Sequence, residues 1–239
     1  MHSEIETLKS WIREAQSAVF FGGAGVSTES GIPDFRSVDG LYSQKFEYPP
    51  ETIISHSFYE KDPSYFFRFY REKMLPLGFE PNVTHRVLAR LEQEGHLSAV
   101  VTQNIDGLHQ KAGSKHVYEL HGSVLRNYCT RCGKFYSAEF VRDAKDVPLC
   151  DCGGIVKPDV VLYEEALDEN TVAKAVSAIR KADLLIVGGT SLTVYPAAGL
   201  LRYYRGDRLV LINRDATPYD AYADLVFHDS LGTIFSQLV

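Results

Sequence analysis

The chain has 239 residues, of which 45% are hydrophobic, and its 31 acidic and 25 basic side chains give a formal net charge of -6. This length allows one domain and a smaller lobe, while the acidic balance, without a run of five basic residues, argues against nucleic acid or a membrane surface as a partner. No window approaches the roughly 18 apolar residues of a membrane-spanning helix, so we expect a cytoplasmic protein.

The first strand is predicted at residues 18–21, after an N-terminal helix whose apolar residues recur at helical spacing. A glycine turn and a helix are expected next, because the apolar run continues into Gly22-Gly23-Ala24-Gly25-Val26-Ser27-Thr28. Glycines let the backbone approach a pyrophosphate closely, and the amides at a helix start stabilise its charge. Thr28 departs from the common dinucleotide pattern, so the turn alone fits a plain turn as well as a nucleotide site.

Helices and buried strands alternate along the rest of the chain. Helices are predicted at residues 83–94, 171–180 and 196–204, followed by a closing helix at the C-terminus, and strands at residues 97–101, 117–120, 183–187, 208–213 and 223–227. This alternation predicts an α/β fold with a doubly wound, parallel, Rossmann-like sheet.

Two segments interrupt the alternation. Residues 37–82 are rich in aromatic residues and prolines, and they predict a small helical module whose aromatics form its own core and pack on the sheet domain. Residues 126–155 hold all four cysteines. We therefore expect a smaller inserted lobe made of these two segments, and a Rossmann-like domain made of residues 1–36, 83–125 and 156–239.

The cysteines form two pairs, Cys129 with Cys132 and Cys150 with Cys152, separated by residues 133–149. This spacing favours a zinc ribbon, although the second pair is C-x-C. Four thiolates leave no coordination position for water, so the zinc would be structural. Two disulfides or free thiols are the alternative, which a reducing compartment disfavours.

Polar side chains follow two of the predicted strands. Gln103, Asn104 and Asp106 come after the strand at residues 97–101, and His121 comes after the next strand. Ligands of open α/β sheets bind at the carboxyl ends of the strands, and an imidazole with an ordinary pKa of about 6.5 suits a general base. Taken singly, His121 fits a hydrogen-bonded strand end better than catalysis, and Asn104 or Asp106 fits a helix cap.

Several motifs occur together and in order: Gly23-Ala24-Gly25-Val26-Ser27, Gly31-Ile32-Pro33-Asp34-Phe35-Arg36, Thr102-Gln103-Asn104-Ile105-Asp106-Gly107-Leu108-His109, His121-Gly122, the four cysteines, Lys157-Pro158-Asp159-Val160-Val161 and Gly189-Thr190-Ser191-Leu192. With them, the chain resembles the sirtuins, which are NAD-dependent protein-lysine deacylases, from about Ser17 to its C-terminus. The resemblance implies NAD as co-substrate, one structural zinc ion and acetylated protein lysines as substrates. The implied products are nicotinamide, O-acyl-ADP-ribose and free lysine.

The resemblance also implies roles for individual residues. His121 matches the general base that acts on a ribose hydroxyl, and Asn104 and Asp106 complete the catalytic group. Phe35 would cover the reactive face and exclude water. The residues that match NAD-binding positions are Gly23, Ala24, Gly25, Ser27, Thr28, Phe35, Arg36, Gln103, Asn104, Ile105, Asp106, His121, Gly189, Thr190, Ser191, Asn213 and Leu231.

The acyl-peptide is expected to pair as an extended strand between residues 160–165 and 192–195. Its expected contacts are Val160, Tyr163, Glu164 and Val194. Where many relatives have Phe-Gly-Glu, this chain has Tyr163-Glu164-Glu165, which adds bulk and charge beside the peptide and favours basic flanking residues.

Acyl preference follows from Phe67 and Tyr70, which align with the Tyr and Arg of relatives that remove succinyl or malonyl groups. Neither residue offers a cation, so acetyl and other neutral acyl groups are favoured. One alternative is a mono-ADP-ribosyltransferase that uses the same NAD pocket. Another is a non-catalytic zinc-ribbon interaction module, which the acidic balance disfavours. A compact chain without long tails fits a monomer.

Overall fold

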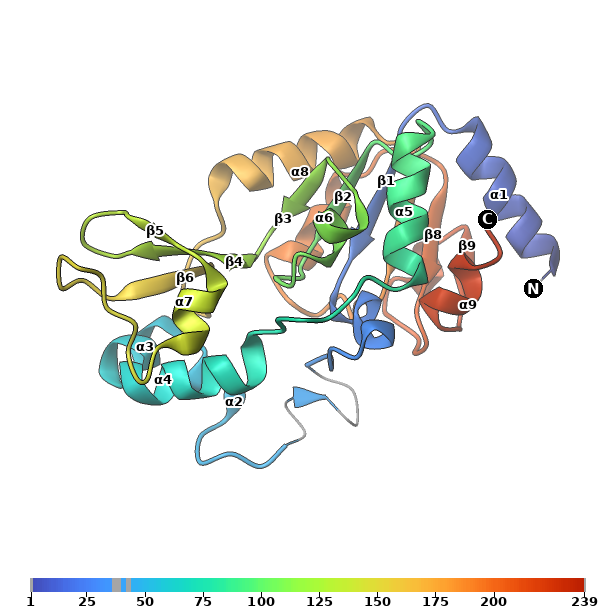
Figure 1. Cartoon of the computed structure of the whole chain (residues 1–239). Helices are drawn as coiled ribbons and strands as arrows, with labels where there is room; N and C mark the ends of the chain where they lie inside the picture. Colours follow the sequence, from blue (N-terminus) through green and yellow to red (C-terminus); the bar gives the residue numbers. More distant parts are fainter. Residues whose placement is uncertain (1, 36–39, 42–43, 239) are drawn as a thin grey trace.

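A six-stranded sheet forms the centre of the larger part of the computed structural model, which describes residues 2–35, 40–41 and 44–238 (Figure 1). Every neighbouring pair of its strands is parallel. The strand order is β3 (Val117–Glu119), β2 (Ala99–Thr102), β1 (Ala18–Gly22), β7 (Leu184–Gly188), β8 (Leu209–Ile212) and β9 (Leu225–Phe227). β1, β2 and β7 are buried at every position, as continuous apolar runs in parallel sheets usually are. The predicted doubly wound sheet is confirmed.

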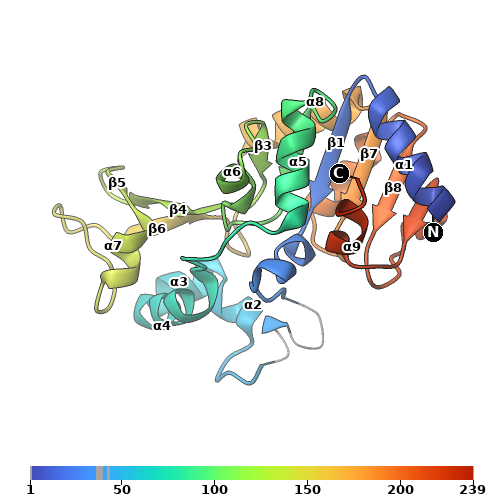
Figure 2. The same cartoon turned by 45° about the vertical axis from the view of Figure 1, so that its right-hand side comes forward.

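Helices cover both faces of this sheet (Figure 2). One face packs against α1 (His2–Glu14), α5 (Val83–Gln93) and α9 (Leu231–Phe235), and the other packs against α8 (Glu169–Lys181) and the 3₁₀ helix η5 (Ala197–Tyr203). The helix α6 (Leu108–Ala112) follows β2, and the 3₁₀ helix η6 (Asp220–Tyr222) precedes β9. None of the helices among the described residues has the length and apolar character needed to cross a bilayer.

The residues after β1 form two short 3₁₀ helices, η1 (Ala24–Val26) and η2 (Thr28–Ser30), where the sequence predicted a glycine turn followed by a helix. That prediction was wrong because backbone N–H groups of this turn donate hydrogen bonds to carbonyl oxygens at the end of β7 and in the loop that follows it. Gly25 N donates to Gly189 O at 2.8 Å, and Gly31, with φ of 90°, ends η2 in the left-handed region. Helices of three residues are too short to build up a macrodipole, and here the backbone packs closely against the loop after β7.

The smaller lobe contains an antiparallel sheet of β5 (Phe135–Tyr136), β4 (Gly122–Cys129) and β6 (Val156–Val160). Its helices are α2 (Pro50–Ile53), α3 (His56–Lys61), α4 (Pro63–Phe69), the π-helical turn η4 (Tyr70–Met74) and α7 (Ala138–Asp143). A single core cluster joins Phe66, Phe67 and Tyr70 of the helices to Val124 and Val156 of the sheet. The helical module and the cysteine segment therefore share one core, and their sheet begins before residue 126 and continues past residue 155.

Candidate active site

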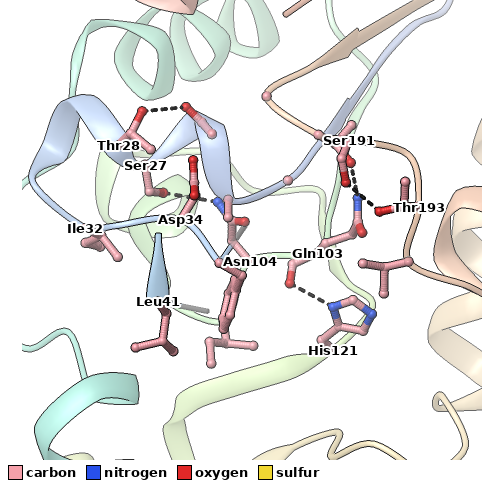
Figure 3. Close-up of a pocket in the computed structure, with 18 of the residues that line it drawn as sticks. Ser27, Thr28, Ile32, Asp34, Leu41, Gln103, Asn104, His121, Ser191 and Thr193 are labelled. Atoms are coloured by element: carbon pink, nitrogen blue, oxygen red, sulfur yellow. Dashed lines mark hydrogen bonds between the residues drawn. The ribbon is translucent and has the colours of Figure 1, made fainter. Parts of the chain in front are cut away.

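A cavity of about 600 Å³ opens where the carboxyl ends of β1, β2, β7 and β8 face the smaller lobe (Figure 3). Arg36 lies outside the described residues. All the other residues predicted to bind NAD or the peptide line this one cavity: Gly23, Ala24, Gly25, Ser27, Thr28, Phe35, Gln103, Asn104, Ile105, Asp106, His121, Val160, Tyr163, Glu164, Gly189, Thr190, Ser191, Val194, Asn213 and Leu231. Residues from position 23 to position 231 are thus brought to the carboxyl edge of the sheet, where open α/β folds bind ligands.

His121 lies between β3 and β4, and its imidazole is oriented by the end of β2. Its Nδ1 is 3.0 Å from the carbonyl oxygen of Gln103 (Figure 3). A carbonyl only accepts, so Nδ1 carries the proton and Nε2 keeps its lone pair. Burial lowers the pKa of His121 from its ordinary value of 6.5, and the hydrogen bond to Gln103 offsets part of that shift. The residue is therefore a neutral base at neutral pH.

Gln103 itself is anchored across the cavity, because its Nε2 donates to Thr190 Oγ1 at 3.0 Å. Thr190 Oγ1 also accepts from the backbone N–H of Leu192 at 3.2 Å. The carbonyl that orients His121 is thereby linked to the loop after β7. The imidazole position depends on two strand-end loops together.

Asn104 and Asp106 meet at the hydroxyl of Ser27. Ser27 Oγ donates to Asp106 Oδ2 at 2.7 Å, and Asn104 Nδ2 donates to Ser27 Oγ at 3.1 Å. Asp106 Oδ1 accepts from the backbone N–H of Leu108 at 2.9 Å, while the N-cap position of α6 itself is Gly107, which makes no side-chain cap. Burial raises the pKa of Asp106, and the hydrogen bonds from Ser27 and Leu108 counteract that rise.

The loops after β1, β7 and β8 pack into one backbone wall. A Cβ atom on Gly25 would lie 2.8 Å from the Cα of Gly189, closer than real contacts allow. Gly189 also has φ of 61°, which favours glycine. Asn213 joins the third loop, since its Oδ1 accepts from Thr190 N at 3.1 Å and its Nδ2 donates to Thr190 O at 2.9 Å. A wall of closely packed, glycine-rich backbone lets a pyrophosphate approach the main chain closely.

The smaller lobe supplies lining residues that the sequence did not reveal. Phe67 and Tyr70 are 0% and 1% exposed in the lobe core and do not line the cavity, whereas Lys73 and Met74, at the end of the π-helical turn that begins at Tyr70, do. A π-helical turn rotates the following side chains relative to an α-helix, and no residue pattern predicted it. Further lining residues that were missed are Leu41, Ile54, Pro76, Arg214, Asp215, Thr217 and Pro218. For the last four, the position after the predicted strand at 208–213 was an available signal.

The four cysteines form a separate cluster outside the cavity. Their Sγ atoms all lie within 4.8 Å of one another, with 3.4 Å between Cys129 and Cys152 and 3.6 Å between Cys132 and Cys150. A tetrahedral zinc with Zn–S bonds of about 2.3 Å places its sulfurs about 3.8 Å apart, so the donor set fits this ion. None of the four sulfurs is in a disulfide.

Comparison with known proteins agrees with this geometry. A family model described as Sir2 family matches residues 23–196. The NAD-dependent protein deacetylase of Clostridium acetobutylicum is 58% identical over 240 residues, covering 99% of this chain and 98% of that protein. The protein of the same name from Staphylococcus aureus is 45% identical over 242 residues, covering 100% and 99%.

Solved structures extend the likeness to the fold. A Sir2 structure with a deacetylated p53 peptide and 3'-O-acetyl ADP ribose superposes with a TM-score of 0.90 at 39% identity, covering 98% of this chain and 96% of that chain. A Sir2 structure with p53 peptide and NAD+ superposes with a TM-score of 0.87 at 40% identity and the same coverage. The likeness thus extends over the parallel sheet and the smaller lobe, and the chain belongs to the Sir2 family.

Proposed function

We propose that this chain removes acetyl groups from protein lysines in a reaction that consumes NAD and yields nicotinamide, O-acetyl-ADP-ribose and free lysine. The names of its relatives and the contents of the solved Sir2 structures support this function. The observation that carries it here is the neutral imidazole of His121, held by Gln103 O in a cavity that also contains the Asn104, Ser27 and Asp106 network.

NAD supplies the ribose carbon that is attacked and the ADP-ribose that takes the acyl group. In our proposal His121 Nε2 accepts the proton of a ribose hydroxyl, because Nδ1 is committed to Gln103 O. Asn104 and Asp106 are proposed to complete the catalytic group, and both are held in position by hydrogen bonds to the hydroxyl of Ser27. Phe35 is proposed to cover the reacting end, where it would exclude water, and Arg36, outside the described residues, keeps its proposed role in NAD binding. The remaining NAD-binding roles proposed are those of the glycine loop, Gln103, Ile105, Gly189, Thr190, Ser191, Asn213 and Leu231.

The substrate side of the proposal places an acetyl-lysine peptide as an extended strand between residues 160–165 and 192–195. Val160, Tyr163, Glu164 and Val194 line the cavity on these two segments, which supports the placement. Phe67 and Tyr70 do not line the cavity, so the proposed range of acetyl and other neutral acyl groups is supported instead by solved Sir2 structures with an acetylated and a propionylated peptide. Lys73 on the cavity wall is the residue to vary when acidic acyl groups are tested.

We also propose that Cys129, Cys132, Cys150 and Cys152 hold one structural zinc, since four thiolates at these separations fill a tetrahedral site. A thiolate metal site suits a reducing compartment, which supports a cytoplasmic location. The net charge of -6 supports a role without nucleic acid, and the working form is proposed to be a monomer. The division into a Rossmann-like domain and an inserted smaller lobe, with the boundaries given above, is proposed with it.

Mass spectrometry of an acetyl-lysine peptide, incubated with the protein in the presence and absence of NAD, tests the proposal. The expected result is loss of the acetyl group only with NAD, together with O-acetyl-ADP-ribose. An unchanged peptide combined with ADP-ribose added to protein would replace deacetylation with ADP-ribosyl transfer.

A further inference from the structure

Two residues of the described chain, other than glycines, have left-handed backbone conformations: Glu164 with φ of 75° and Leu192 with φ of 56°. They lie on the two segments that flank the proposed peptide position. A left-handed conformation costs a residue with a Cβ atom about 1 to 2 kcal/mol. Glu164 is exposed, so core packing does not compensate for that cost, and specific contacts must do so.

The side chain of Glu164 supplies such contacts. Its Oε2 accepts from the backbone N–H of Ser57 at 2.9 Å, and its Oε1 accepts from Ser57 Oγ at 3.0 Å. Both carboxylate oxygens are thus bound to a single residue of α3. The carboxylate is directed at the smaller lobe and is already hydrogen-bonded there.

The neighbouring backbone makes the same connection. Tyr163 N donates to Ile54 O at 3.1 Å, and His56 N donates to Tyr163 O at 3.0 Å, which forms a parallel bridge between Ser55 and Tyr163. Glu165 adds a second carboxylate, with Oε1 2.9 Å from His56 Nδ1. Glu164 therefore binds Ser57, and Glu165 binds His56, the residue before it in α3.

The other end of this segment reaches the proposed base. Val161 N donates to the carbonyl oxygen of His121 at 3.0 Å. Residues 161–165 thus run as a strap from His121 to α3, and every one of them lines the cavity. Displacing the strap would change the width of the cleft and the position of the strand that the peptide is proposed to join.

We infer that Glu164 is a positioning residue that sets the width of the peptide cleft by holding the strap, residues 161–165, against Ser57 of α3. This inference rests on the proposed function, because it concerns how the peptide is received. Glu164 acts through Ser57 and the strap, and its carboxylate does not pair with basic side chains of the substrate. It is hydrogen-bonded on both oxygens before any peptide arrives.

The test compares three substitutions in the full chain. Glu164→Gly removes the carboxylate and the backbone strain together, and the loss of two hydrogen bonds is expected to raise KM for an acetyl-peptide about fivefold or more, with kcat and KM for NAD near wild type. Glu164→Gln keeps an acceptor oxygen for Ser57 N and an amide that can donate to Ser57 Oγ, so its KM is expected within about twofold of wild type. Glu164→Asn tolerates the left-handed conformation but is too short to reach Ser57, and it serves if the glycine variant does not fold.

A second measurement separates positioning from charge. Hydrogen exchange of the amides in residues 54–57 and 161–165 is expected to be faster in Glu164→Gly than in wild type, while Glu51→Gln, which removes one exposed charge from the same lobe, should match wild type in exchange and in KM. A Glu164→Gly variant with wild-type KM and exchange would overturn the inference. The inference would also be overturned if Glu164→Gln and Glu164→Gly raised KM for the peptide equally, by a factor that grows with the number of basic residues in the peptide and disappears at high salt. If wild type shows no turnover, the proposed function fails, and the exchange comparison still decides whether Glu164 holds the strap.

Discussion

The hydroxyl of Ser27 donates a hydrogen bond of 2.7 Å to the carboxylate of Asp106, although 79 positions separate the two residues in the chain. Ser27 is 1% exposed and Asp106 is 9% exposed, so water cannot readily replace either partner. The same hydroxyl accepts from the amide of Asn104. One buried oxygen atom thus joins the loop after β1 to the loop after β2.

Replacing Ser27 with alanine should therefore disturb both loops. Asp106 loses a donor and Asn104 loses an acceptor, and an unpaired buried polar group costs about 1 to 3 kcal/mol. We expect Ser27→Ala to lower the free energy of unfolding by about that amount in urea and to raise KM for NAD. Ser64→Ala, at an exposed position of α4, is the control and should stay within about 0.5 kcal/mol of wild type. Unchanged stability and KM would show that the hydroxyl does not connect the loops.

The acid limb of activity should lie below pH 6.5. Burial lowers the pKa of His121, so the neutral, proton-accepting form persists to lower pH than in a free histidine. The measurement is kcat/KM for nicotinamide release from about pH 5 to 8. His121→Ala should nearly abolish turnover while leaving folding and bound metal intact. A limb at or above pH 6.5, or normal activity in that variant, would contradict the base assignment.

Two buried histidines outside the cavity should make the fold sensitive to acid. His85 and His109 have ring centroids 4.7 Å apart, and burial lowers the pKa of His85 to about 4 and that of His109 well below 6.5. The unfolded chain binds protons on these residues at a higher pH than the folded chain does. The contribution of these neutral histidines to the free energy of unfolding is therefore fully present above pH 6.5. It is lost as pH falls toward 4, by roughly 3 kcal/mol for His85 alone.

Urea unfolding at several pH values across this window measures the effect. His109→Leu removes one of the two titrating rings and should flatten the dependence of the free energy of unfolding on pH. A wild-type protein with constant stability between pH 6.5 and 4.5 would show that these histidines are protonated equally in both states.

The cysteine cluster predicts one metal ion per chain. Elemental analysis should find one zinc, and Cys150→Ser should lose it, because three thiolates and a hydroxyl bind zinc less well. The smaller lobe shares its core with this segment, so its unfolding temperature should fall and activity should fall indirectly. Full stability and activity in protein without metal would remove the zinc assignment.

The larger sheet could be predicted from the sequence because its strands are apolar runs bounded by glycines and polar residues. Strands of this kind, such as β1 and β7, are recognisable without their neighbours. The helix predicted after β1 was wrong for the opposite reason. The conformation of Ala24–Val26 depends on bonds to Gly188 and Gly189, which lie far along the chain and leave no mark in the local pattern.

The cavity residues that belong to the family motifs could be predicted from the sequence, and His121, Asn104 and Asp106 do line the cavity. The contribution of the smaller lobe was not predictable. Lys73 and Met74 reach the cavity through a π-helical turn, which has no composition signal, while Tyr70 beside them is buried. The contacts of Glu164 were also hidden, since nothing in the sequence connects it with Ser57.

The position of β1 between β2 and β7 has a consequence for biosynthesis. A nascent chain that ends before β7 already contains His121 and all four cysteines, yet it lacks Gly189, Asn213 and Leu231 from the cavity wall. Such a fragment also leaves one edge of β1 without its neighbour. The nucleotide pocket is therefore completed only when the last strands have left the ribosome, so prematurely terminated products keep the metal ligands but cannot build the full binding site.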